Sequence, residues 1–211
     1  MALCSLGCKD QASENSLPIN EEIAALKTIG QKNDYLEKIF RADQDIRDGR
    51  DSELVLKYGL DSPEVQSFYS KMTSIDSHNL EKIEFYLKEF GYPSSDSVTR
   101  EAAMTPWIVI HHSTDVDKRK GFFSVLYQAY NNGFINTDQF ELYLGRTYKF
   151  EFGTYPFGEG AYDPNEKINR LIEELNLKKY NRRTSTKPIK STASPLMVYY
   201  YFKLVSKPRQ N

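Results

Sequence analysis

The sequence predicts a mainly α-helical fold: a compact multi-helix domain with a small two-stranded β element near the C-terminus. Apolar residues recur every three or four positions through most of the chain, which is the spacing of one helix face. Residues typical of helix starts and stops bracket these segments. The chain of 211 residues, 39% hydrophobic and 27% charged, also has the length and composition of a globular domain with its own core.

Capping residues predict where the helices begin, because they satisfy the free N–H groups of a first turn. The expected starts are Asn20, Asn33, Ser62-Pro63, Thr105-Pro106, Asp115, Asn136 with Gln139, and Asp163-Pro164. The helix that starts at Ser62 either breaks or continues through Asp76-Ser77-His78-Asn79. Gly91 and Pro93 are expected to end it.

One predicted helix and two predicted strands stand out by composition. Trp107-Ile108-Val109-Ile110 is apolar on every side, which predicts a helix through the middle of the domain. Tyr148, Phe150 and Phe152 alternate with polar residues, and Leu196–Val205 is rich in β-branched and aromatic residues. These two stretches are expected to pair as the small β element.

Three regions are predicted: a leader and flexible tether over 1–18, the helical domain over 19–180, and a basic C-terminal extension with one strand over 181–211. The extension lies in a stretch, from Lys178 to Asn211, that holds nine Lys or Arg and no acidic residue, although the whole chain has a net charge of −1. The simplest interpretation is a solvated end that balances an acidic body. No RNA-binding or recognition-helix motif accompanies it, so no nucleic-acid partner is expected.

The leader predicts a lipid anchor at Cys8. Gly7 precedes this cysteine and a polar stretch follows it, which resembles a bacterial lipoprotein processing site and its tether. Because the usual basic region and apolar run are missing, we expect the true start to lie upstream of Met1. The expected location is the cell envelope, with membrane contact only through this anchor. The alternative is a cytoplasmic protein with an ordinary N-terminal tail.

Several motifs that would carry chemistry are missing. The two cysteines, Cys4 and Cys8, both lie in the leader, so the domain has no disulfide and no cysteine metal site. An EF-hand centred on Gly133 would place Gln128, Tyr130 and Gln139 where calcium needs carboxylates. Phosphate-binding loops, HExxH and dinucleotide fingerprints are absent too. We therefore expect neither a metal nor a cofactor.

Polar residues at helical spacing on apolar faces form the candidate site. Asp43 and Arg47 lie one turn apart on the face that carries Leu36 and Phe40, and a charge on such a face needs a partner. His112 ends the apolar Trp107 helix, where the helix dipole favours a positive imidazole. The predicted polar cluster consists of Asp43, Arg47, Asp76, Asn79, His112 and Arg146.

The same cluster permits two interpretations. In the first, it is a sealed hydrogen-bonded network that fixes helix packing in a non-catalytic cell-envelope lipoprotein domain. In the second, it is a pocket of a hydrolase or binding protein, in which arginines hold a phosphate or carboxylate and His112 is the general acid or base. Exposure separates the two, because a pocket leaves His112 and at least one arginine in contact with solvent.

Between about Tyr35 and Tyr180 the chain resembles the bacterial domain-of-unknown-function family 6624, in its Bacteroidota form. The matching elements are Asp43-Gln44 with Arg47, Asp76, Asn79, Gly91-Tyr92-Pro93, Trp107 through His112, Arg146, and Phe152-Gly153-Thr154. The resemblance aligns the family's histidine with His112 and puts His111 where glutamine is usual. It implies no activity, because the family has none assigned.

Overall fold

The computed structural model describes residues 17–157 and 163–183, with side chains as far as Tyr180. These residues are mainly helical, which confirms the helical part of the predicted fold class. They contain no strand, so the predicted two-stranded β element is not supported in this part of the chain. The helices are α1 Ile19–Ala24, α2 Ile29–Asp45, α3 Arg50–Tyr58, α4 Pro63–Phe90, α5 Arg100–His112, α6 Val116–Gly121, α7 Phe123–Asn131, α8 Thr137–Phe152, α9 Pro164–Glu174 and the 3-10 helix η1 Leu177–Arg183.

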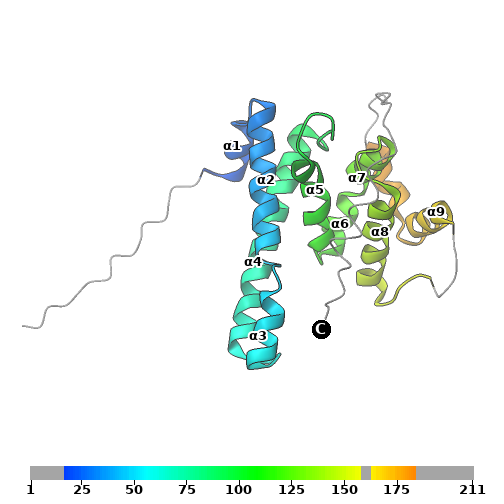
Figure 1. The fold of residues 1–211 in the computed structure, drawn as a ribbon. Coiled ribbons are helices and arrows are strands. Elements are labelled where there is room, and N and C mark those ends of the chain that lie inside the picture. Colours follow the sequence, from blue (N-terminus) through cyan, green and yellow to red (C-terminus); the bar gives the residue numbers. More distant parts are fainter. Residues whose placement is uncertain (1–16, 158–162, 184–211) are drawn as a thin grey trace, which may run out of the picture.

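Helix α5 lies in the middle of the domain, as its all-round apolar sequence predicts. It packs against α2 and α4 on one side and against α8 on the other (Figure 1). Every residue from Thr105 to Ile110 is buried. The Trp107 indole also donates a hydrogen bond to the Gln139 carbonyl at the start of α8, at 2.9 Å. This bond joins α5 to the start of α8, while α2 and α4 contact α5 from its other side.

Two helices begin earlier than their predicted caps. Helix α2 begins at Ile29, where Thr28 and Gln31 form a capping box, and not near Asn33. The side chain of Asn33 instead accepts a hydrogen bond from the Thr99 amide. Helix α1 follows Pro18, although Asn20 was the expected cap. The predicted starts at Ser62, Asp115, Asn136 and Asp163 are confirmed by side-chain caps, and Gly91 ends α4.

Helix α5 begins at Arg100, and the predicted start at Thr105-Pro106 is wrong. Thr99 caps the helix, and Pro106 lies inside it. A proline removes only one backbone hydrogen bond, and the burial of almost the whole helix outweighs that loss. The Thr105 hydroxyl, next to the proline, donates to the Glu101 carbonyl at 2.7 Å and to the Leu36 carbonyl on α2 at 3.1 Å.

The strand predicted over Tyr148–Phe152 is also wrong, because these residues form the last turns of α8. Tyr148 and Phe152 lie one turn apart, with ring centroids 4.5 Å from each other, so the alternating aromatics pack along a helix. Gly153 closes the helix in the left-handed conformation. The other predicted strand, Leu196–Val205, lies outside the described residues.

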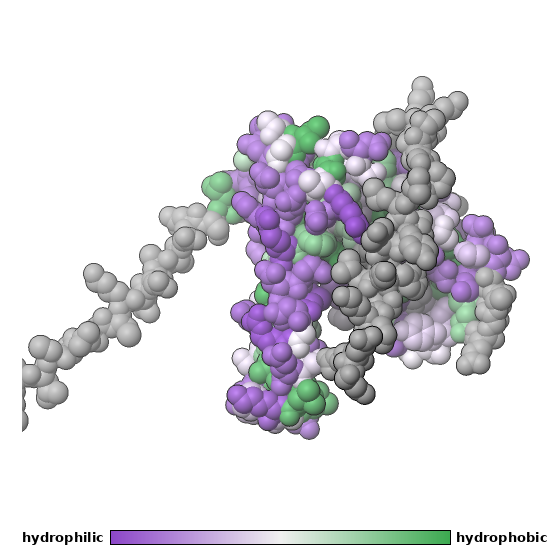
Figure 2. Space-filling view, viewed as in Figure 1, coloured by the Kyte–Doolittle hydropathy of each residue, from purple (hydrophilic) through white to green (hydrophobic). Residues whose placement is uncertain are grey.

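Helices α3 and the first half of α4 form a hairpin that extends beyond the other helices (Figure 1). No residue of α3, which the sequence did not predict, is buried. Leu56 and Leu60 are 82% and 59% exposed, and Figure 2 shows hydrophobic surface at the far end of this hairpin. Helix α4 is continuous through Asp76–Asn79 and carries the hairpin into the core.

The predicted lipid-attachment residue, Cys8, lies outside the described residues, as do Cys4 and the extension after residue 183. None of the helices in the described part of the chain is long and apolar enough to cross a membrane.

Candidate functional site

Arg47 joins α2 to α4 through two carboxylates. Its Nη1 donates to Asp43 Oδ1 at 3.1 Å, one turn back on α2, and its Nη2 donates to both oxygens of Asp76 at 2.6 and 2.7 Å. Asp76 lies on α4, near the point where the hairpin leaves the body. Both terminal nitrogens of the guanidinium therefore bind protein carboxylates.

Asp43 is the buried centre of the site. Its side chain is 1% exposed, and it accepts hydrogen bonds from Arg47, from the Gln44 amide at 2.7 Å and from His112 Nδ1 at 2.8 Å. The contact with His112 crosses from α2 to the C-terminal end of α5. Because Nδ1 is occupied by Asp43, the Nε2 atom of His112 is the one left for other partners, and it makes no hydrogen bond to the described residues.

Arg146 reaches the same end of α5 from α8. Its Nη1 lies 3.3 Å from His111 Nε2, and its guanidinium lies over the Phe150 ring at 5.2 Å from the centroid. The His111 ring stacks on Trp107 and lies 5.7 Å from the His112 ring. Among the described residues, Arg146 has no carboxylate partner.

The corner formed by His111 and Arg146 holds hydrogen-bonding atoms without partners. His111 Nδ1 and Arg146 Nε are both buried and make no hydrogen bond within the described residues. Burial, with the nearby Arg146, His112, Arg119 and Arg47, lowers the pKa of His111 to about 3. The imidazole is therefore neutral at pH 7. When Nε2 accepts from Arg146, Nδ1 carries the proton, so both unpartnered atoms are donors.

Arg119, from α6, fixes the end of α5 on which both histidines lie. It is fully buried and donates to Thr147 Oγ1 and to the four carbonyls of Ile110, His111, Ser113 and Tyr143, at 2.7 to 3.0 Å. The last carbonyls of a helix have no partner within the helix and attract a cation. Burial lowers the pKa of Arg119 to about 10, which leaves it charged at pH 7.

We call Asp43, Arg47, Asp76, His111, His112 and Arg146 the Asp43–His112 cluster. Four of the six residues predicted from the sequence are in direct contact: Asp43, Arg47, Asp76 and His112. Arg146 joins them through His111. The sixth, Asn79, is buried but makes no hydrogen bond to the cluster, and it lines a separate pocket between α2 and α4.

The Asp43–His112 cluster is not sealed from solvent. The side chain of His112 is 18% exposed, and those of Arg47 and Asp76 are each 20% exposed. The arrangement is a buried carboxylate below a partly exposed imidazole. Of the three arginines near this end of α5, only Arg47 is paired with carboxylates, those of Asp43 and Asp76. Arg119 and Arg146 have no carboxylate partner among the described residues, which leaves an excess of positive charge.

Sequence reasoning missed Arg119 and gave His111 no role. Arg119 lies between Lys118 and Lys120, a pattern typical of a solvent-exposed charged turn. No feature of the neighbouring sequence indicates that its side chain is buried. His111 follows Trp107 by four residues, and that aromatic spacing was the available signal for a stacked ring. In the described part of the chain, no three His, Cys, Asp or Glu side chains gather closely enough to hold a metal ion.

The comparisons with known proteins assign no family. No protein-family model, no curated protein and no solved structure matches the chain. The resemblance to family 6624 therefore stays a prediction, and function is inferred from the geometry alone.

Proposed function

We propose that the Asp43–His112 cluster binds a small ligand that carries a phosphate or carboxylate group, and that the Asp43–His112 pair serves as its general base in hydrolysis. The observation that supports this most is the pairing of His112 Nδ1 with a buried aspartate while the imidazole stays 18% exposed. In a sealed packing network, the histidine side chain would have no contact with solvent.

The anionic group of the ligand would lie at Arg146 and His111. Arg47 is engaged with two carboxylates, whereas Arg146 makes only a 3.3 Å contact to a neutral imidazole. Arg146 Nε and His111 Nδ1 are buried donors without a partner among the described residues, and each needs an acceptor. A phosphate or carboxylate supplies such acceptors with the charge that a guanidinium prefers.

His112 would act on the proton of the attacking water. Asp43 fixes the tautomer, so that Nε2 holds the free electron pair, and stabilises the imidazolium that forms when Nε2 accepts the proton. The Asp43 carboxylate keeps this role because its buried oxygens are held by Arg47 and Gln44. Arg119 maintains the distance between the histidines and α8 by holding the end of α5.

Titration of the full chain with inorganic phosphate and with acetate tests the anion site. The expected result is a saturable change in the His111 and His112 imidazole NMR signals, weakened at least about tenfold by Arg146→Met, since a charged hydrogen bond contributes about 1.5–3 kcal/mol. Arg41→Met is the matched control, because Arg41 is an exposed arginine on α2. Equal weakening by both variants, or no saturable change, would rule out the anion site.

A panel of p-nitrophenyl phosphate and carboxylate esters tests the base. We expect His112→Gln to lower the rate on any accepted ester by about 100-fold or more while ligand binding persists, as loss of a general base does. An unchanged rate on that ester excludes His112 as the base. If no ester in the panel is hydrolysed, the hydrolytic part of the proposal fails and the binding part is judged by the titration.

A second function, fixing the packing of the helices, is favoured by the Arg47–Asp76 bridge between α2 and α4, in which Nη2 contacts both carboxylate oxygens. It predicts that every cluster variant changes stability and that no anion changes the histidine signals. The anion titration therefore separates the two functions.

We also propose that the domain is held at the cell envelope by a lipid on Cys8. The support is the sequence pattern around that cysteine, with Gly7 before it and a polar stretch after it. Metabolic labelling with an alkyne fatty acid, in cells that express the natural reading frame, is expected to label the protein. Cys8→Ser should abolish the label and Cys4→Ser should not. A label that survives Cys8→Ser, or is never present, contradicts the anchor.

A further inference from the structure

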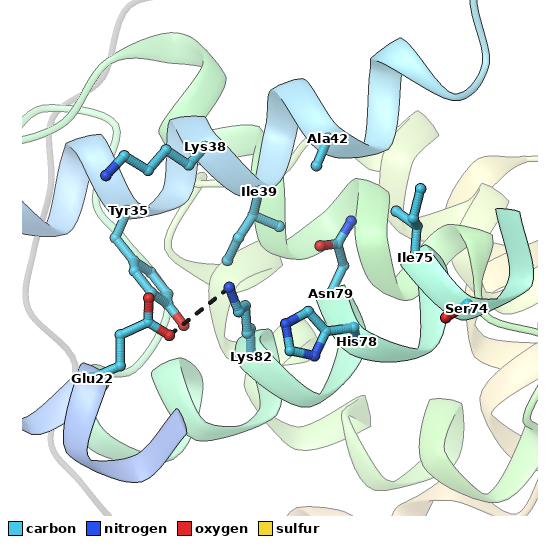
Figure 3. Close-up of a pocket in the computed structure, with 10 residues that line it drawn as sticks. All are labelled: Glu22, Tyr35, Lys38, Ile39, Ala42, Ser74, Ile75, His78, Asn79 and Lys82. Atoms are coloured by element: carbon cyan, nitrogen blue, oxygen red, sulfur yellow. Dashed lines mark ion pairs between the residues drawn. The ribbon is translucent and has the colours of Figure 1, made fainter. Parts of the chain in front are cut away.

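A pocket of about 310 Å³ lies between α1, α2 and α4 (Figure 3). None of its lining residues belongs to the Asp43–His112 cluster. Its lining residues on α2 include Tyr35, Ile39 and Ala42, which recur at the spacing of one helix face. Asp43 follows Ile39 by one turn but does not line the pocket. On α4, Ile75 and Asn79 line it while the neighbouring Asp76 points to Arg47. The volume is at the lower end of the range of small-molecule sites.

One buried polar group of this pocket has no partner within the described residues. The Asn79 side chain, in a residue only 4% exposed, has an unpartnered Nδ2. The Tyr35 hydroxyl, in contrast, lies against the Glu22 carboxylate (Figure 3). Leaving the buried Asn79 donor unpaired costs stability. A bound molecule with hydrogen-bond acceptors would remove that cost.

The other residues that line the pocket indicate the chemistry of the rest of the ligand. Ile39, Ala42 and Ile75 provide apolar surface, which fits a hydrocarbon body. Lys38 and Lys82 line the same pocket against a single carboxylate, Glu22, which lies 3.8 Å from the Lys82 ammonium. The charge balance therefore favours an anion over a cation. Burial and the Glu22 carboxylate, with which its hydroxyl hydrogen-bonds, raise the pKa of Tyr35, so this hydroxyl is protonated and donates to Glu22.

We infer that this pocket binds a small monocarboxylic acid with an apolar body. The carboxylate accepts from Asn79 and lies near the two lysines, while the hydrocarbon part covers Ile39 and Ile75. The inference concerns a separate site and does not depend on the activity of the Asp43–His112 cluster.

Binding of 4-methylpentanoate to the full chain, followed in ¹H–¹⁵N NMR spectra, tests this site. A probe of this size is expected to bind with a Kd on the order of 1 mM, and its uncharged analogue 4-methylpentanamide at least about fivefold more weakly. The largest shifts should fall on the Asn79 side-chain amide and the Ile75 backbone. No saturable shift up to about 10 mM, or equal affinity for the amide, would overturn the inference.

Three variants locate the binding. Asn79→Leu removes the amide and Ala42→Leu fills the pocket from its rim without touching a buried polar group; each should weaken the probe at least about tenfold, as loss of about 1.4 kcal/mol does. Ala24→Leu, the same substitution at an exposed position of α1 outside the lining, should leave the affinity unchanged. Equal affinity in wild type and Ala42→Leu would contradict the site.

The two anion sites are separated by Arg146→Met. If the carboxylate binds at Asn79, this variant leaves the probe's affinity for the pocket unchanged. Shifts confined to His111 and His112, and lost in Arg146→Met, would place the carboxylate at the other site and overturn this inference.

Discussion

Two arginines approach the same end of α5 in opposite ways. Arg119 is fully buried, and its hydrogen bonds run to one hydroxyl and four backbone carbonyls of neighbouring segments. Arg146 is only partly buried, and its one hydrogen-bond contact is a 3.3 Å approach to His111, with Nε left unpartnered. Both lack a carboxylate among the described residues. The hydrogen-bond donors of Arg119 are paired within the fold, whereas Arg146 Nε has no partner among the described residues.

This difference separates an arginine that stabilises the fold from one that can bind a ligand. A guanidinium whose donors are all paired with protein acceptors has none left for a ligand, and its removal leaves those acceptors unpaired. A guanidinium with unused donors beside a partly exposed histidine keeps that capacity. Stability measurements should therefore rank these residues in the reverse order of their value for binding.

The largest loss of stability is expected from Arg119→Met. The substitution leaves buried carbonyls of α5 and α8 without donors, so the free energy of unfolding should fall by about 3–5 kcal/mol. Urea unfolding measures it. The control is Lys118→Met, one residue earlier and 46% exposed, which should change stability by less than about 0.5 kcal/mol. A loss below about 1 kcal/mol for Arg119→Met would erase the distinction between the two arginines.

A smaller effect is expected for the pair Asp43 and Arg47. Because Asp43 is 1% exposed, a double-mutant cycle with Asp43→Asn and Arg47→Met should give a coupling of about 1–3 kcal/mol. The exposed pair Glu37 and Arg41 on the same helix has the same spacing at 4.0 Å and should give about 0.3–0.5 kcal/mol. Equal couplings for the two pairs would show that burial adds nothing to the cluster.

The acid sensitivity of the fold should depend on His111. Its pKa in the folded protein is lowered to about 3, from 6.5 in the unfolded chain, so only the unfolded state binds this proton between those values. Stability should be nearly unaffected above about pH 6.5 and fall by up to about 1.4 kcal/mol per pH unit between about pH 6 and pH 3. His111→Gln should be nearly silent at pH 7 and should flatten this slope, whereas an unchanged slope would mean that other groups control it.

The smallest effect on stability is expected from Arg146→Met. Its single long contact contributes little, and the substitution removes a buried N–H that has no partner, so the change should stay within about 1 kcal/mol in either direction. The same urea unfolding experiment measures it beside Arg119→Met. A loss as large as that of Arg119→Met would make Arg146 a structural residue and weaken its proposed part in anion binding.

The sequence predicted what depends on neighbouring residues. The caps at Ser62, Asn136 and Asp163 and the stop at Gly91 are local, and all four are present. The pairing of Asp43 with Arg47 follows from a spacing of four residues on one helix. The start of α5 was misplaced because a proline is a strong local signal, and only packing of the whole helix against its neighbours overrides it.

Features that depend on distant contacts could not be predicted. Arg119 lies between Lys118 and Lys120, and its inward direction is set by carbonyls that belong to α5 and α8. Asn79 is one turn from Asp76 in sequence, but the two side chains face different neighbours. The alternation of aromatic and polar residues near Phe150 is typical of a strand. These residues instead continue a helix that begins at a cap, Asn136, and ends at Gly153.

The long helix α4 has a consequence for hydrogen exchange. Its 28 residues span about 42 Å, and before Asp76 only Val65 is buried. The hairpin it forms with α3 is therefore expected to open without the core, and its amides to exchange much faster than those after Leu80. The boundary between fast and slow amides should fall near Asp76, where Arg47 holds α4 to α2. Amide exchange across α4 would thus report directly on whether that bridge is closed.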